Sequence, residues 1–208
     1  MSLRAGYLKD GYCTPLDIFS PDEVDELYRG YRKYVKTYGT PGEGVLVGDL
    51  RFRLHVVAKW ARDIIFAPKL VAAVKEILDT DDLLCWDSDL NIKTPGSDGF
   101  FSWHQDGTYS GHSPASGVVT AWVALSPATP ESGCLQFRPG SHQAQLPHEE
   151  TKDPNNLLAV GQTIPIDDMK HLQAPVVAPL RPGQVHCFVN SSNEVATSRF
   201  QLHLFCCI

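Results

Sequence analysis

Residues 83–93 read Leu-Leu-Cys-Trp-Asp-Ser-Asp-Leu-Asn-Ile-Lys, and this stretch decides the fold class of the chain. Its even-numbered positions are mostly apolar and its odd-numbered positions are mostly polar, which is the period of two expected of a half-buried strand. Pro95 and Gly96 end the pattern. The alternation predicts a strand over residues 84–92, with Asp87 and Asp89 as polar positions exposed to solvent.

Before this stretch the pattern is helical. Ser20, Pro21 and Glu23 supply an N-cap, a proline at the first helical position and the acid of a capping box. The apolar positions that follow recur at helical spacing. A second helical pattern begins at Pro68 and stops at the acidic residues 79–82. Both apolar stripes are interpreted as core packing without chemistry.

After this stretch the chain consists of short strand-like runs. Further strands are predicted at residues 118–125, 135–138, 176–180, 185–189 and 200–205, with clusters of Pro and Gly between them. Helices followed by strands indicate an α+β chain whose β part is a jelly roll. We therefore expect one domain over residues 1–208, helical to about residue 82 and jelly roll from about residue 83. The polar connection at about 143–173 is the expected lid insertion.

Bulk properties narrow the class of protein. The chain has 208 residues, of which 43% are hydrophobic, which suits one domain with a substantial core. The net charge of −6 argues against nucleic acid as a partner. No apolar run predicts a membrane span or a signal peptide, and the six cysteines form no C-x-x-C pair. We expect a soluble cytoplasmic protein that acts on a small molecule; the sequence does not set its oligomeric state.

The chemistry-bearing motif is Trp103-His104-Gln105-Asp106. In extended backbone His104 and Asp106 point to one face and Gln105 points away. An imidazole and a carboxylate on one face supply two ligands of a 2-His-1-carboxylate site, which binds Fe(II) and keeps coordination positions open. By itself an H-x-D motif is weak, because two residue types at one spacing recur by chance.

Five blocks of the sequence together are more specific, and they resemble the phytanoyl-CoA dioxygenase-like family in order and spacing from about residue 7 to Gln184. The blocks are residues 7–12, 103–109, 120–125, 131–135 and 138–142. The resemblance implies a double-stranded β-helix of the cupin type that binds Fe(II) through His104 and Asp106 and uses 2-oxoglutarate as cosubstrate. It also implies hydroxylation, because halogenating relatives lack the carboxylate at the position of Asp106.

The third iron ligand is the open question. In the family pattern a distal His precedes an Asn by five residues, and alignment on Asn193 places Phe188 there. One interpretation is a shortened strand pair, with His186 as the distal ligand and Arg199, thirteen residues later, binding the carboxylate of 2-oxoglutarate. The other is a divergent or alternatively spliced tail over the last 24 residues, which lacks the ligand and part of the last strands.

Two further side chains are candidates for the cosubstrate site. Trp122 lies on a predicted strand next to the H-x-D motif, and Lys93 ends the first predicted strand. The alternatives are core packing for Trp122 and a solvent-facing strand end for Lys93. His142 is expected to form a hydrogen bond within its turn, and His148 is expected to be solvated or to approach the site.

The leading hypothesis is an Fe(II)/2-oxoglutarate-dependent dioxygenase that hydroxylates a small organic substrate and releases succinate and CO₂. The metal ligands would be His104, Asp106 and His186, and the cosubstrate would bind Arg199, Trp122 and Lys93. The alternative is a catalytically inactive, truncated member that acts, if at all, as a binding protein. A zinc-dependent hydrolase has less support, because no motif places a general base.

Overall fold

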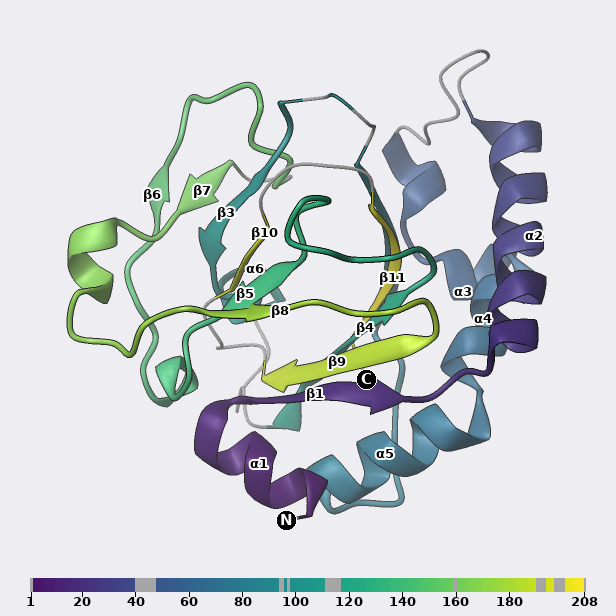
Figure 1. Cartoon of the computed structure of the whole chain (residues 1–208), viewed down its shortest axis with the longest axis horizontal. Helices are drawn as coiled ribbons and strands as arrows, with labels where there is room; N and C mark the ends of the chain where they lie inside the picture. The colour runs from purple at the N-terminus through teal and green to yellow at the C-terminus, as the bar shows by residue number, and fades with distance from the viewer. Residues whose placement is uncertain are drawn as a thin grey trace.

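The computed structural model describes residues 2–39, 48–93, 96, 98–110, 117–158, 161–189, 194–196 and 201–207. Two antiparallel sheets lie at the centre of the molecule, and most of the helices cover one side of it (Figure 1). The chain therefore combines helices and sheets, as the change of pattern at residue 83 predicts.

Helices lie where the sequence contains a capping signal or a repeated apolar spacing. They are α1 (Leu3–Asp10), α2 (Pro21–Tyr38), α3 (Leu54–Val57), α4 (Lys59–Ile65), α5 (Pro68–Leu78) and α6 (Gly107–Ser110), with 3₁₀ turns η1 (Gly48–Arg51), η3 (Ser141–Gln143) and η4 (Ile166–Met169). Both bonds of the predicted capping box start α2: Glu23 N–H donates to Ser20 Oγ over 3.3 Å, and Ser20 N–H donates to Glu23 Oε2 over 2.7 Å. In the described part of the chain, no helix is both long and apolar enough to cross a membrane.

The strands form two large sheets and one small one. They are β1 (Tyr12–Asp17), β2 (Asp87–Lys93), β3 (Phe101–His104), β4 (Val119–Ala124), β5 (Leu135–Phe137), β6 (Glu149–Glu150), β7 (Gln162–Thr163), β8 (Val176–Ala178), β9 (Gln184–Val189), β10 (Glu194–Ala196) and β11 (Gln201–Cys207). The five-stranded sheet has the order β1-β9-β4-β11-β2, and the four-stranded sheet has the order β3-β10-β5-β8. The β6–β7 pair lies in the predicted lid segment, beside β3.

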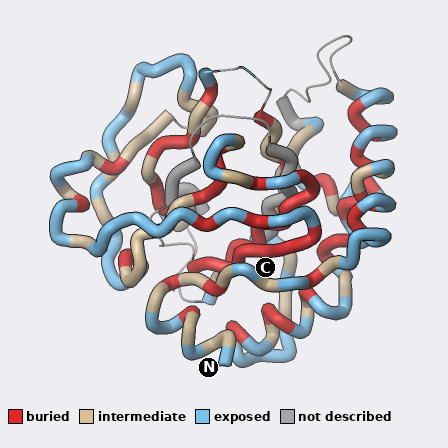
Figure 2. Tube along the Cα trace, viewed as in Figure 1, coloured by how far each residue is buried: buried red, intermediate tan, exposed pale blue. Residues whose placement is uncertain are grey.

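Strand β4 shows how the two cores are divided. Its residues Val119, Ala121 and Val123 belong to the core between the five-stranded sheet and the helices, whereas Trp122 and Ala124 belong to the core between the two sheets. The five-stranded sheet is therefore covered on both faces, and its strands β4 and β9 are buried throughout (Figure 2).

Two expectations from the sequence are corrected here. The N-terminal part is not only helical, because β1 pairs with β9 at the edge of the five-stranded sheet. Asp89 is not an exposed position: its side chain is only 16% exposed and lies 3.9 Å from Arg51 through Oδ2 and Nη2. The physical reason is the covering of both sheet faces, since Leu90 and Ile92 pack towards the helices and the alternate positions turn towards the second sheet.

Candidate metal centre

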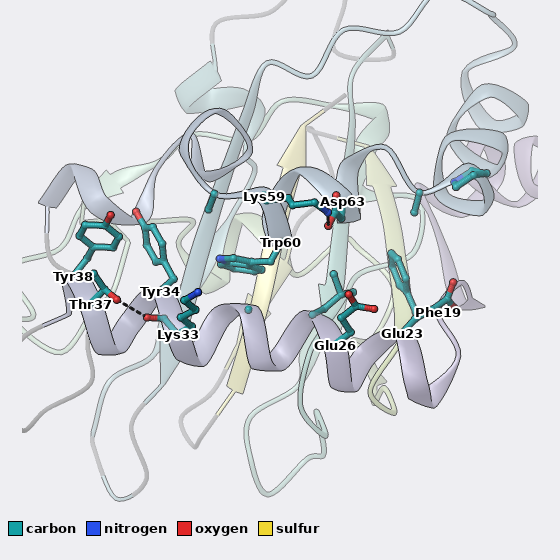
Figure 3. Close-up of a pocket in the computed structure, with 15 residues that line it drawn as sticks. Phe19, Glu23, Glu26, Lys33, Tyr34, Thr37, Tyr38, Lys59, Trp60 and Asp63 are labelled. Atoms are coloured by element: carbon teal, nitrogen blue, oxygen red, sulfur yellow. Dashed lines mark hydrogen bonds and ion pairs between the residues drawn. The ribbon is translucent and has the colours of Figure 1, made fainter.

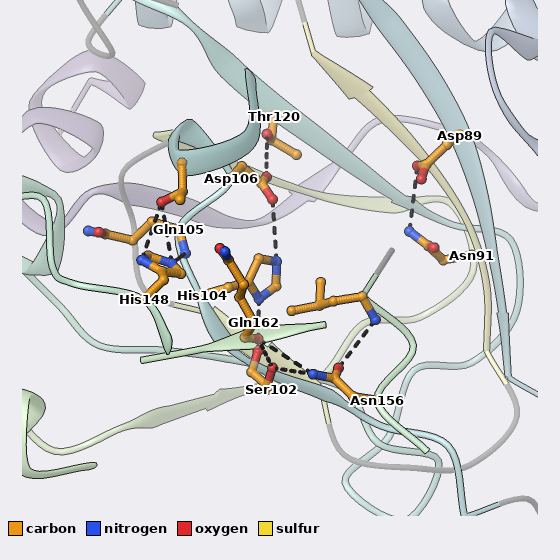
Figure 4. A network of polar contacts seen from close by, with 12 residues as sticks. Asp89, Asn91, Ser102, His104, Gln105, Asp106, Thr120, His148, Asn156 and Gln162 are labelled. Atoms are coloured by element: carbon orange, nitrogen blue, oxygen red, sulfur yellow. Dashed lines mark hydrogen bonds and ion pairs between the residues drawn. The ribbon is translucent and has the colours of Figure 1, made fainter. Parts of the chain in front are cut away.

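The H-x-D motif lies where β3 ends and α6 begins. The end of β3 places His104, and two residues later Asp106 enters the turn before α6. His104 Nε2 and Asp106 Oδ1 lie 3.3 Å apart, and both side chains are largely buried (Figure 4). The prediction that this spacing brings the two side chains together is confirmed.

Hydrogen bonds set the chemical state of this pair. His104 Nδ1 lies 2.8 Å from the carbonyl oxygen of Ser102, which can only accept, so Nδ1 carries a proton and Nε2 is the ring nitrogen that faces Asp106. On the other side, Thr120 Oγ1 donates to Asp106 Oδ2 over 3.1 Å, so that Oδ1 faces the imidazole. The backbone carbonyl and the threonine hydroxyl therefore orient two metal-binding atoms towards the same point, as outer partners of metal ligands do.

Gln105, between the two candidate ligands, holds the neighbouring segment in place. Its fully buried side-chain amide donates to the carbonyl of Ala144 over 3.0 Å and accepts from the backbone N–H of Leu146 over 2.8 Å. Its own backbone N–H donates to His148 Nε2 over 3.0 Å. His148 is thus not simply solvated, because it ties the lid segment to the H-x-D turn. Its pKa is lowered by burial.

His186 lies elsewhere. It belongs to β9 of the five-stranded sheet, whereas the strand that pairs with β3 at His104 is β10. Its imidazole is fully buried with its centroid 5.3 Å from those of the Trp122 and Phe137 rings, and its Nδ1 shares a hydrogen bond with Thr14 Oγ1. Burial lowers the pKa of His186 to about 3, an effect partly offset by the backbone of Ala178.

The structure thus brings His104 and Asp106 together and does not bring His186 to them. Among the residues described, no three His, Cys, Asp or Glu side chains form a group that could hold a metal ion. Arg199, the candidate anchor for 2-oxoglutarate, lies outside the described residues.

Lys93 is not a solvent-facing strand end. It is 1% exposed, its Nζ donates to the carbonyl of Gly133 over 3.1 Å, and it lies 5.5 Å from the centroid of the Phe101 ring. Burial lowers its pKa to about 8. Trp122 is 2% exposed and lies in the core between the sheets. Lys93 is therefore a buried cation on the inner side of β2. Trp122 packs in the core between the two sheets.

Sequence reasoning missed the polar positions that line β2 near the metal centre. Burial raises the pKa of Asp89 to about 7, against the opposing effect of Arg51, and the nearby charges of Asp87 and Asp106 raise it further. Figure 4 shows Asp89 and Asn91 together on the strand across from Asp106. The alternation in residues 84–92 places these polar residues on one face of the strand. It predicts that they are buried only if both faces of the sheet are known to be covered.

The chain belongs to the phytanoyl-CoA dioxygenase (PhyH) family, whose sequence profile matches residues 7–189. Among curated relatives, phytanoyl-CoA dioxygenase domain-containing protein 1 of Danio rerio is 35% identical over 89 residues, or 41% of this chain and 31% of the relative. The protein of the same name from Mus musculus is 32% identical over 110 residues, or 53% of this chain and 38% of the relative. The matches thus span less than two fifths of each relative.

Solved structures share the fold. The non-heme monooxygenase ThoJ has a TM-score of 0.83 at 23% identity, covering 99% of this chain and 76% of ThoJ. The epimerase SnoN, in complex with Fe³⁺, alpha ketoglutarate and nogalamycin RO, has a TM-score of 0.73 at 19% identity, covering 99% and 81%. EctD from S. alaskensis with 2-oxoglutarate and 5-hydroxyectoine has a TM-score of 0.75 at 21% identity, covering 98% and 73%. The chain therefore shares its fold with these three solved proteins.

Replacement of Thr120 by valine tests the outer partner of the pair. Thr120→Val keeps the side-chain shape and removes the donor to Asp106 Oδ2, so we expect the affinity for Mn(II) to fall about tenfold. Electron paramagnetic resonance of free Mn(II) during titration measures this change. The matched control is Thr37→Val, whose hydroxyl donates to the carbonyl of Lys33 within α2 and whose loss should leave the affinity unchanged. An unchanged affinity in Thr120→Val would remove Thr120 from the site.

Proposed function

We propose that this protein is an Fe(II)/2-oxoglutarate-dependent dioxygenase that hydroxylates a small organic substrate and releases succinate and CO₂. The observation that carries the proposal is the convergence of His104 Nε2 and Asp106 Oδ1, which lie 3.3 Å apart. The other polar atom of each side chain, Nδ1 of His104 and Oδ2 of Asp106, already forms a hydrogen bond. Family membership supports the same reaction class. We also propose that the two facing sheets are a double-stranded β-helix and that the protein is cytoplasmic, which the four free cysteines in the described residues support.

The residues of this chain fit the metal in their chemistry. One neutral imidazole and one carboxylate suit Fe(II) and leave positions for a bidentate cosubstrate and O₂. When bound, Fe(II) supplies the activation of O₂ that inserts one oxygen atom into a substrate C–H bond and the other into the succinate formed from 2-oxoglutarate. The protein's part is to turn Nε2 of His104 and Oδ1 of Asp106 towards the same point before the metal arrives.

The cosubstrate is assigned to the interior beside β2. Lys93 is a buried ammonium group on the inner side of β2, and its positive charge suits a carboxylate of 2-oxoglutarate as a ligand. Trp122, on the central strand β4, is proposed to line the same interior. Arg199 stays a proposed second anchor on the grounds of sequence alone.

A second candidate function is a member that binds ligands without turnover. The observation that favours it is the described residues' lack of a three-ligand group around His104 and Asp106. With two protein ligands, water would fill the third protein position and the metal would exchange readily. Such a protein would bind a small organic molecule and 2-oxoglutarate weakly.

Anaerobic titration of the protein with Fe(II) and 2-oxoglutarate separates the two candidates. A dioxygenase is expected to develop the weak visible charge-transfer band of a bidentate complex, and His104→Ala should abolish it because the imidazole is one of the two converging donors. His171→Ala, which changes an exposed histidine in the lid segment, serves as the control and should keep the band. Fe(II) binding without any band would favour the non-catalytic candidate, and no Fe(II) binding would reject the dioxygenase and leave the non-catalytic candidate.

A further inference from the structure

The lid segment is bonded to the backbone on both sides of His104. Before this residue, the carbonyl of Trp103 accepts from the backbone N–H of Ile164 over 2.8 Å. After it, the backbone N–H of Gln105 donates to His148 Nε2 over 3.0 Å. The two peptide groups that flank this candidate ligand are therefore both held by the lid segment.

The contact between Gln105 and His148 is part of a closed network with Leu146, named here the His148 network. His148 Nδ1 donates to the carbonyl of Leu146 over 3.0 Å, and the N–H of Leu146 donates to Gln105 Oε1 over 2.8 Å. A backbone N–H can only donate and a carbonyl can only accept, so the His148 ring is neutral with its proton on Nδ1. Figure 4 shows this ring beside Gln105, next to the metal centre.

The His148 network fixes the backbone that joins the two candidate ligands. A peptide group is planar, so the bond to the N–H of Gln105 also sets the direction of the His104 carbonyl. The next peptide group is held as well, because the Gln105 carbonyl accepts from the N–H of Thr108 over 3.0 Å. The 3.3 Å approach of His104 Nε2 to Asp106 Oδ1 therefore depends on a backbone that the lid segment orders.

We propose that His148 is a positioning residue of the metal centre, and that metal binding and the order of the lid segment are coupled through its bond to Gln105. The proposal rests on the metal site of the proposed function. His148 acts through the peptide group between the ligands and not as a ligand. Coupling between two sites is reciprocal, so bound metal stabilises the bonded lid segment by the same factor by which the lid raises the metal affinity. The centre is then fully assembled only when the lid segment is in place.

Titration with Mn(II), followed by electron paramagnetic resonance of the free ion, tests the metal side of the coupling. His148→Leu removes both hydrogen bonds of the ring and should lower the affinity about tenfold, the lower end of the range for outer partners of metal ligands. His148→Gln keeps an acceptor near the position of Nε2 and should retain most of the wild-type affinity. His171→Leu, at an exposed histidine of the same segment, is the matched control and should bind as the wild type does.

A second control lies in the helical layer. Figure 3 shows a pocket of about 720 Å³ between α2 and α4, where the hydroxyl of Thr37 donates to the carbonyl of Lys33 over 2.9 Å. The residues that line this pocket do not include any member of the His148 network. Thr37→Val should therefore leave both the Mn(II) affinity and the order of the lid segment unchanged.

Hydrogen exchange measured by mass spectrometry tests the lid side of the coupling. The N–H of Leu146 is bonded to Gln105 Oε1, so saturating Mn(II) should slow its exchange about tenfold in the wild type. In His148→Leu the same addition should have little effect. The N–H of Asp79, which is bonded to Lys75 at the end of α5, should exchange equally with and without Mn(II).

The outcomes separate this proposal from the metal site on which it rests. Wild-type affinity in His148→Leu, or exchange of Leu146 that ignores Mn(II), would overturn the coupling while the metal site stands. No Mn(II) binding by the wild type would reject the metal site and the coupling together. Should His148→Leu fail to fold by circular dichroism, Gln145→Met takes its place. It removes the 2.6 Å bond from the exposed Gln145 to Thr108 Oγ1 and should lower the Mn(II) affinity by a smaller factor, whereas unchanged affinity would contradict the coupling.

Discussion

Acidification from pH 6.5 to pH 3 is expected to remove about 4 to 5 kcal/mol of folding free energy through His186. The pKa of His186 falls from 6.5 to about 3 on folding because its imidazole is fully buried. Between these two values the unfolded state binds a proton and the native state does not. Stability therefore rises with pH across this window, and it is lost as the pH falls.

The double variant Thr14→Val/His186→Leu isolates this effect. It replaces both partners of one buried hydrogen bond by apolar groups of similar size, so that neither is left unsatisfied. Urea unfolding at pH 6.5 and pH 4 should show that the variant loses less stability than the wild type. His171→Leu, at an exposed histidine, should behave as the wild type does. Equal losses in wild type and double variant would show that His186 does not stay neutral in the native state.

The same double variant tests the ligand role that the sequence predicts for His186. If His186 only bridges Thr14 and the aromatic core, the affinity for Fe(II) stays the same in the variant. If His186 is the third ligand in the loaded protein, the affinity falls with that of His104→Ala. The geometry favours the first outcome, because Nδ1 of His186 is bonded to Thr14 and the described residues hold no three-ligand group that includes His104, Asp106 and His186.

The structural features that the sequence predicts correctly involve residues close to one another in the chain. The capping box at Ser20 and Glu23 fixed the start of α2, and the spacing of two between His104 and Asp106 brought their side chains together, because both relations involve residues close in sequence. β1 could not be predicted in this way, since Pro15 argues against a strand. An edge position next to β9 tolerates Pro15, and only the folded topology shows that β1 lies at an edge.

The face of a polar residue depends on contacts that are distant in sequence. The period of two in residues 87–93 correctly groups Asp89, Asn91 and Lys93 on one face, opposite Leu90 and Ile92. Periodicity by itself assigns the polar face to solvent. The second sheet covers that face instead, and its strands come from residues 101–196. The buried Lys93 and the largely buried Asp89 follow from this covering.

Lys93→Met is expected to reduce the affinity for 2-oxoglutarate about a hundredfold at pH 7. The variant keeps a side chain of similar length and removes the buried cation proposed to meet a carboxylate, and loss of one partner of a buried charge pair typically costs about 2–5 kcal/mol. Competition with a fluorescent cosubstrate analogue, or titration calorimetry, measures the affinity. Lys152→Met, at an exposed position of the lid segment, is the control and should bind normally. Normal binding by Lys93→Met would place the cosubstrate elsewhere.

The pH dependence of stability tests Lys93 without any ligand. Burial lowers the pKa of Lys93 from 10.5 to about 8, so between these values the unfolded state holds a proton that the native state has lost. Stability should therefore rise with pH across this window, by about 3 kcal/mol from this residue. Tyrosines and cysteines also titrate there, and they do so in wild type and Lys93→Met alike except for Cys134, whose pKa is lowered by the Lys93 charge and which is therefore replaced by serine in both proteins. The difference in unfolding free energy between the two proteins at pH 7.5 and pH 10 thus isolates Lys93, and a constant difference would mean that its ammonium group is solvated.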